Sequence, residues 1–163
     1  MTLKNIRDTI LAIIGSDTEL QNADFNTFIN EGYTNVISKI LDERKDFFPD
    51  NETIAVTSGD IDYTPTKTWS NITLIQIDFG DGVGYQTLTK SSLETVLGAN
   101  STDTRNILIY HLWGDILYVP NFGKTATMRI YGYVIPTALS GDSDTPAFSS
   151  LLHPCLVTWG VGR

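Results

Sequence analysis

Residues 107–135, ILIYHLWGDILYVPNFGKTATMRIYGYVI, decide the fold class of this chain. Apolar and aromatic residues recur in short runs that turn residues separate, which is typical of antiparallel strands. Gly114 and Asp115 divide the first half into two such runs. Residues 107–112 and 116–119 are therefore predicted to form a β-hairpin.

Strand signals extend on both sides of this hairpin. Residues 125–135 follow a turn and are predicted to be one long strand that ends at Pro136. Upstream, residues 72–77 carry apolar side chains on both faces, so this strand should be covered on both sides. Residues 53–57 and 61–63 flank a glycine-containing turn and are predicted to pair as a second hairpin.

Helical periodicity replaces the strand pattern toward the N-terminus. Thr2 is predicted to cap a first helix that ends at Gly15, and a second helix is predicted to start at Asn22 or Asp24. Gly32 lies inside the second helix, where a glycine costs about 1 kcal/mol relative to alanine, and a close helix–helix approach at that point is one physical reason for the glycine. The predicted apolar stripes contain Leu3, Ile6, Ile10, Ile13 and Ile14 in the first helix and Phe25, Ile29, Val36 and Ile40 in the second.

These patterns predict an α+β protein. Its helical layer comes from residues 1–48 and 149–163, and residues 49–148 form an inserted antiparallel β-sandwich or barrel, the whole being one compact unit. The helical stripes of the two ends each need a partner face, so the ends are predicted to pack together. Within the insertion, Ser91 and Glu94 form a capping box for a short helix.

The composition excludes several classes of function. The formal net charge is -8, from 19 acidic and 11 basic residues, which argues against a sequence-independent grip on nucleic acid. Such acidity still permits surfaces past which DNA slides without sticking. One cysteine, Cys155, excludes an intrachain disulfide framework. Charged residues interrupt the N-terminal stripe, so we expect neither a signal peptide nor a membrane span, and synthesis in a cytoplasm.

No catalytic constellation is readable, so we expect no enzyme activity, no cofactor and no metal site. Asp78-Phe79-Gly80 spells a kinase motif, but the other kinase motifs are absent and a turn explains these residues. Asp78 and Asp81 could ligate a hard cation, yet the twelve-residue calcium loop that ends in Glu is missing.

Isolated residues with reactive side chains also have structural explanations. His111 is predicted to be a partly buried residue in mid-strand. His153 and Cys155 lie two apart in a predicted helix, so their side chains point to opposite sides and cannot form a nucleophile–base pair. Cys155 is predicted to be a small core residue. Asp142 and Asp144 are predicted to lie in a solvated loop.

Aromatic residues on the predicted strands allow two interpretations. Alternation puts Tyr131 and Tyr133 on one face and Ile130 and Val134 on the other, so both faces are apolar. Together with Trp113, the tyrosines could belong to a thick core or anchor a protein partner. Stacking on nucleic acid is disfavoured, because few basic residues accompany these aromatics.

The order of these segments resembles a known family. TLKNIRDTILAIIGS and NADFNTFINEGYTNVISKIL are similar to the two helices that begin tailed-phage head–tail adaptor (connector) proteins. AVTSGDIDYTP and ILIYHLWGDILYVPNFGKTATMRIYGYVIPTALSGDSDTP are similar to the strands and the Pro- and Asp-rich loop of these adaptors. HPCLVTWGVGR resembles the start of their C-terminal helix.

The resemblance implies a structural role in the neck of a virion. Such a protein forms a homo-oligomeric ring under the portal protein, of twelve copies by family analogy, and joins the capsid to tail proteins. Genome DNA would pass by without sequence-specific binding, and no membrane would be involved. Members of this group usually continue well past the equivalent of residue 163, so the resemblance implies either a shortened form or a last segment that a partner orders.

The last segment supplies further interface candidates. It holds more apolar residues than one helix face can bury, and its two glycines weaken it, so a partner is expected to order it. The leading alternative is a carbohydrate- or protein-binding β-sandwich module with accessory helices, and a weaker one is a small hydrolase. The interface candidates are Trp159, Leu156, Val161, Arg163, Tyr131, Tyr133 and Trp113.

Overall fold

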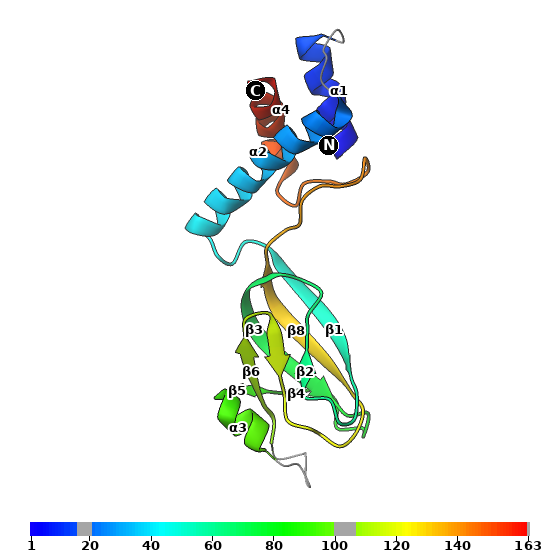
Figure 1. Cartoon of the computed structure of the whole chain (residues 1–163), viewed down its shortest axis with the longest axis vertical. Coiled ribbons are helices and arrows are strands. Elements are labelled where there is room, and N and C mark those ends of the chain that lie inside the picture. Colours follow the sequence, from blue (N-terminus) through cyan, green and yellow to red (C-terminus); the bar gives the residue numbers. More distant parts are fainter. Residues whose placement is uncertain (16–20, 100–106, 163) are drawn as a thin grey trace. The chain divides into compact units, whose positions relative to one another are not determined.

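The computed structural model describes residues 1–15, 21–99 and 107–162. They form four α-helices and two four-stranded sheets, which confirms the predicted α+β class (Figure 1). The chain divides into two compact units, a helical unit of Met1–Phe47 with Pro136–Arg163 and a β unit of Phe48–Ile135. The predicted domain arrangement, a single compact whole, stays a prediction.

The helical unit contains α1 (Leu3–Ile14), α2 (Asn22–Glu43) and α4 (His153–Val161), with a 3-10 turn at Ser150–Leu152 before α4. The Thr2 side chain accepts a hydrogen bond from Asn5 N–H and caps α1, as predicted. Leu3, Ile6 and Ile10 are fully buried. Ile13 and Ile14 are 58% and 41% exposed, so their assignment to the buried stripe was wrong. The last turn of α1 therefore does not contribute these side chains to the buried interior of the helical unit.

Helix α4 packs against both α1 and α2, so the prediction that the two ends of the chain meet is confirmed. A Cβ atom on Gly32 would lie 2.8 Å from Cγ and 2.9 Å from Cδ1 of Trp159. A Cβ atom on Gly160 would collide with the side chain of Ile10. Both glycines are therefore needed because they let two helices approach closely.

We expect Gly32→Ala to destabilise the helical unit by about 1 kcal/mol, because the clash with Trp159 outweighs the gain in helix propensity. In a Trp159→Ala background the clash is gone, and the same substitution should stabilise α2 by up to about 1 kcal/mol. Thermal unfolding of the four chains measures this reversal of sign. An equal effect in both backgrounds would show that the Gly32–Trp159 contact does not limit the packing.

Buried polar contacts fix the segment between Pro136 and α4 to the first two helices. The buried guanidinium of Arg7 pairs with Asp142 at 3.0 Å and donates to Asn26 Oδ1 at 3.2 Å. The Asn30 amide makes two 2.8 Å hydrogen bonds to the backbone of Leu139. The predicted description of Asp142 as part of a merely solvated loop is therefore incomplete, because its carboxylate ties this segment to α1.

Asp144 organises the same segment locally. Its Oδ2 atom accepts hydrogen bonds from the backbone N–H groups of Ser140 and Gly141, at 2.7 and 2.8 Å. These bonds lower the pKa of the Asp144 carboxyl, because they stabilise its charged form. Leu3 N–H donates to the Asp144 carbonyl at 2.8 Å, so this turn also lies against the start of α1.

The β unit contains two separate sheets. The first has the strand order β1-β8-β3-β4 and the second the order β2-β7-β6-β5. Neither sheet closes into a barrel. Helix α3 (Leu93–Gly98) is capped by Ser92, whose hydroxyl accepts a hydrogen bond from Thr95 N–H, and not by the predicted Ser91. The strands are β1 (Pro49–Val56), β2 (Asp62–Tyr63), β3 (Trp69–Asp78), β4 (Gln86–Thr87), β5 (Thr89–Lys90), β6 (Ile109–Trp113), β7 (Ile116–Tyr118) and β8 (Ala126–Val134).

The predicted hairpin of β6 and β7 is confirmed, since Trp113 pairs with Ile116 across the turn. The predicted hairpin of residues 53–57 and 61–63 is wrong. Strand β1 pairs antiparallel with β8, whereas β2 pairs with β7 in the other sheet. The turn between β1 and β2 therefore carries the chain from one sheet to the other.

One hydrophobic core joins residues from both sheets of the β unit. The first sheet contributes one face of β1, β3 and β8, and the second contributes β2 and β7. Because both sheets bury side chains in the same cluster, the arrangement resembles a β-sandwich. The cluster comprises Val56, Tyr63, Ile75, Ile77, Phe79, Leu88, Leu117, Val119, Phe122, Met128 and Ile130.

Candidate functional site

Asp78, the aspartate of the kinase-like tripeptide, and Asp81, which follows the tripeptide, each stabilise a turn. Asp78 Oδ1 accepts from Gly80 N–H at 2.9 Å, and Asp81 Oδ1 accepts from Val83 N–H at 3.1 Å. Within the described part of the chain, no group of three His, Cys, Asp or Glu residues could hold a metal ion. These carboxylates therefore have structural partners, as the turn interpretation expects.

Both histidines have backbone partners. His111 Nδ1 donates to the Ser91 carbonyl at 2.7 Å, which links β6 to the start of α3. His153 is 2% exposed, its Nε2 donates to the Phe148 carbonyl at 3.1 Å, and its Nδ1 lies 3.0 Å from the amino group of Met1. Cys155 is exposed, so its prediction as a small core residue was wrong.

The outer side of the last helical segment forms the first candidate surface. We define the C-terminal apolar surface as Leu151, Leu152, Cys155, Trp159 and Val161. The exposed fractions of Leu151, Leu152 and Val161 are 85%, 38% and 36%. Cys155 and Trp159 also line a shallow hollow of about 450 Å³. Helix α4 is apolar nearly all round, and α1 and α2 cover only one of its sides.

Two of the predicted interface residues in this segment serve the interior of the helical unit. Leu156 is fully buried, so its side chain cannot reach a partner without unfolding the unit. Trp159 is only partly exposed, because one edge of its indole lies against Gly32. Val161 is exposed as expected. Arg163 lies outside the described residues.

The outer face of the first sheet is the second candidate surface. Ile130 is fully buried, so Tyr131 and Tyr133, at alternate positions of β8, point away from the core. Leu74 of β3 pairs in register with Tyr131, and Arg129 stacks over the ring of Tyr85 at 4.1 Å. We name Leu74, Tyr85, Tyr131 and Tyr133 the tyrosine face.

Trp113 belongs to neither surface. It lies at the end of β6, where the hairpin to β7 turns, and 65% of it is exposed. Tryptophan side chains are seldom this exposed to solvent, and tryptophan often anchors protein interfaces. Trp113 is therefore accessible. It belongs to the β unit, whereas the C-terminal residues belong to the helical unit.

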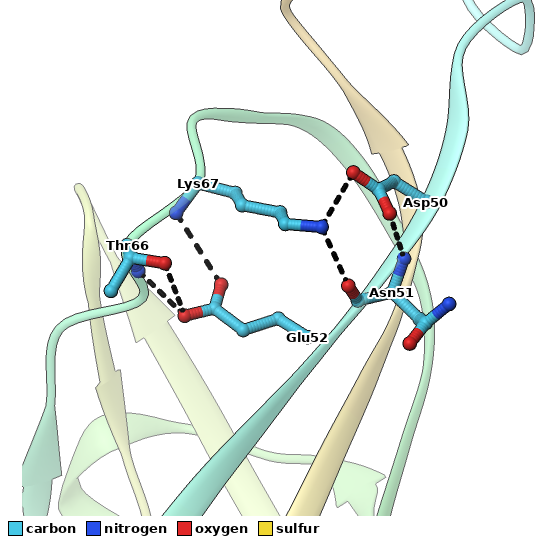
Figure 2. A network of polar contacts seen from close by, with 5 residues as sticks. All are labelled: Asp50, Asn51, Glu52, Thr66 and Lys67. Atoms are coloured by element: carbon cyan, nitrogen blue, oxygen red, sulfur yellow. Dashed lines mark hydrogen bonds and ion pairs between the residues drawn. The ribbon is translucent and has the colours of Figure 1, made fainter.

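A network of polar contacts lies beside β1 and joins Asp50, Asn51, Glu52, Thr66 and Lys67 (Figure 2). The carboxylate of Glu52, 9% exposed, accepts from Thr66 N–H at 2.7 Å, from Thr66 Oγ1 at 2.9 Å and from Lys67 N–H at 3.4 Å. Lys67 Nζ donates to Asp50 Oδ2 at 2.6 Å and to the Asn51 carbonyl at 2.7 Å. The network therefore fastens the segment before β3 to the edge of β1.

The Lys67 ammonium lowers the pKa of the Asp50 carboxyl, mainly by its hydrogen bond. A carboxyl whose pKa is lower in the folded than in the unfolded state adds stability above the unfolded pKa of about 3.9. That stability is lost as the pH falls through the folded pKa. Because both side chains are partly exposed, about 0.5 kcal/mol is expected for this pair.

We therefore expect Asp50→Asn to lower the stability of the β unit by about 0.5 kcal/mol at pH 7 and by nothing near pH 2. The asparagine can keep the hydrogen bond from Asn51 N–H, so the variant removes mainly the charge. Chemical unfolding across this pH range, with Lys67→Met as the matched partner variant, provides the measurement. A difference that persists unchanged at pH 2 would contradict the ion-pair explanation.

The polar clusters around Glu52 and Arg7 were not predicted from the sequence. Glu52 and Thr66 are fourteen residues apart, and Arg7 and Asp142 are much further apart. Neither spacing matches a helix or hairpin pattern. The one available signal was a charged residue at a position where the apolar pattern predicts burial, because Glu52 shares a face of the strand with Ile54 and Val56.

Comparison with known proteins agrees with the predicted class of protein. A family model described as SU10 adaptor protein matches residues 1–163, which is the whole chain. No curated protein matches the sequence. Among the described residues, no helix is long and apolar enough to cross a membrane.

Proposed function

We propose, from the premise that this chain belongs to the SU10 adaptor protein family, that it forms a ring under the portal of a tailed phage. Membership makes it a phage adaptor protein and a virion component, and the family is structural rather than catalytic. In the proposed role the ring joins the portal protein to tail proteins. Its expected size is twelve copies by family analogy, and genome DNA passes without sequence-specific binding.

The C-terminal apolar surface is the observation that carries this proposal. Helix α4 packs against α1 and α2, while Leu151 and Leu152 of the preceding 3-10 turn and Val161 at the end of α4 remain exposed. Burying one leucine side chain contributes about 2 kcal/mol. A repeated subunit contact that covers these residues would therefore supply binding energy without disturbing the packed interior of the helical unit.

The β unit offers separate contacts for a tail-side partner. Tyr85, Tyr131 and Tyr133 of the tyrosine face are half-buried, Trp113 is exposed, and none of them belongs to the buried core cluster. Aromatic side chains supply large contact areas at protein interfaces. We assign the helical unit to ring and portal contacts and the β unit to tail proteins. The acidic composition supports this arrangement, because a net charge of -8 lets DNA pass without adhering.

Charge inserted into the C-terminal apolar surface tests the proposal. We expect Leu151→Asp to weaken binding of the full chain to purified portal protein in co-sedimentation by at least about tenfold, since it forfeits roughly 1.5–3 kcal/mol of leucine burial. Leu97→Asp is the matched control, because Leu97 is 49% exposed on α3 of the other unit. Its binding should equal that of the wild type.

Two outcomes would contradict the proposal. Equal co-sedimentation of Leu151→Asp and wild type would exclude the C-terminal apolar surface as the contact. A wild-type chain that stays monomeric and never sediments with portal would favour the alternative, a binding module that acts alone. Glycan-array binding by such a monomer would then identify the carbohydrate-binding version of that alternative.

A further inference from the structure

Strand β1 is an outer strand of the first sheet, so one side of its backbone has no strand beside it. Successive residues of an antiparallel strand alternate in direction. One residue points both its N–H and its carbonyl toward the neighbouring strand, and the next points both away from it. The Asn51 N–H donates to Asp50 Oδ1 at 2.8 Å, and the Asn51 carbonyl accepts from Lys67 Nζ at 2.7 Å. Asn51 therefore faces away from β8, and so do Thr53 and Ala55.

Side chains close this outer edge at Asn51. Figure 2 shows the Lys67 side chain reaching across to Asp50 and to the Asn51 carbonyl. The Lys67–Asp50 ion pair measures 2.6 Å. The backbone N–H and carbonyl of Asn51 are therefore bound by two side chains that also bind one another. Charged side chains that cap the edge of a sheet prevent another strand from adding there.

The same edge is open two residues further on. Thr53 and Ala55 are exposed, and no described residue outside the β1–β8 ladder makes a backbone hydrogen bond to either of them. The segment Thr53–Thr57, TIAVT, contains no charge and no proline, and four of its five residues are β-branched. An uncharged, β-branched edge of this kind readily pairs with another strand.

We propose that the edge formed by Thr53 and Ala55 binds an extended segment of another protein of the particle by strand addition. Each of the two residues presents one N–H and one carbonyl, and the two residues lie about 7 Å apart along the strand. Only another extended backbone can pair with all four of these groups. The exposed Asp60 follows the edge in the next turn and favours a basic residue at that end of the bound segment.

The occupant is not a second β1. Two identical strands that pair edge to edge make an isologous contact, which closes at a dimer and cannot continue around a ring. This step rests on the proposed ring. The Asp50–Lys67 pair then sets the register, because a bound strand can extend over Thr53 and Ala55 but not over Asn51.

Photo-crosslinking in assembled particles tests the inference. A photo-reactive residue replaces Thr53 in the full chain, and the matched control replaces Thr89, an exposed residue of β5 in the second sheet. We expect an adduct with another particle protein from position 53 and at least a tenfold lower yield from position 89. No adduct from position 53, or an adduct only with a second copy of this chain, would overturn the inference.

A backbone variant provides an independent arm. Ala55→Pro removes the outward N–H but no hydrogen bond to β8, and proline is tolerated at such edge positions. We expect it to reduce the position-53 adduct about tenfold, whereas Ala55→Ser should leave it unchanged. An unchanged adduct with Ala55→Pro would contradict strand addition. Particles that contain no copy of this chain would instead contradict the proposed function.

Discussion

Replacing Gly132 by alanine is expected to lower the free energy of unfolding of the β unit by about 3 kcal/mol. Gly132 lies in β8, between β1 and β3, and a Cβ atom there would collide with the carbonyl oxygen of Asn71. It would also lie 2.9 Å from the Cα atom of Ile72. Because these atoms belong to the backbone of β3, no side-chain rotation can relieve the overlap.

Gly98→Ala serves as the control, since a Cβ atom on Gly98 would meet nothing within 4 Å. Gly98 lies in α3 of the same unit, so both variants report on one unfolding transition. Urea unfolding followed by circular dichroism gives both free energies. A loss below about 1 kcal/mol for Gly132→Ala would show that β3 and β8 separate easily at their irregular register.

Replacing Leu156 by alanine is expected to destabilise the helical unit by about 3 kcal/mol. Its side chain is fully buried in α4, which packs against α1 and α2, so truncation leaves a cavity. Leu151→Ala is the matched control in the same segment, because Leu151 is 85% exposed and should change stability by less than about 0.5 kcal/mol.

The same pair of variants separates folding from assembly. Leu151→Ala should weaken portal co-sedimentation although the helical unit melts normally, whereas Leu156→Ala should lower the melting temperature. Equal melting temperatures for Leu156→Ala and wild type would show that Leu156 is not part of the core. It would then return to the set of interface residues in which the sequence first placed it.

Local signals allowed much of the fold to be predicted. The cap at Thr2, the hairpin of β6 and β7, and the need for a close approach at Gly32 each depend on residues near one another or on one unusual residue. The failed hairpin of residues 53–57 and 61–63 shows the limit of such signals. The chain does turn between these two segments. However, β1 pairs with β8, and each residue of β1 lies at least seventy positions from its partner in β8.

The interface residues were harder to predict for the same reason. A count of apolar residues in the last segment, residues 149–163, does not reveal which of them α1 and α2 cover, so buried Leu156 and exposed Leu151 look alike in the sequence. Cys155 was assigned to the core on composition alone, although it lies on the uncovered side. The edge of β1 could not be predicted either, because Lys67, which caps the Asn51 carbonyl, lies sixteen residues away in sequence.

The most direct test of the central proposal is the number and position of copies of this chain at the portal vertex. Native mass spectrometry of the isolated portal assembly, with cryo-electron microscopy of the same sample, measures both. The adaptor assignment predicts a closed ring of identical copies, twelve by family analogy, on the tail side of the portal. A portal assembly without this chain, or with single copies that make no ring, would contradict it.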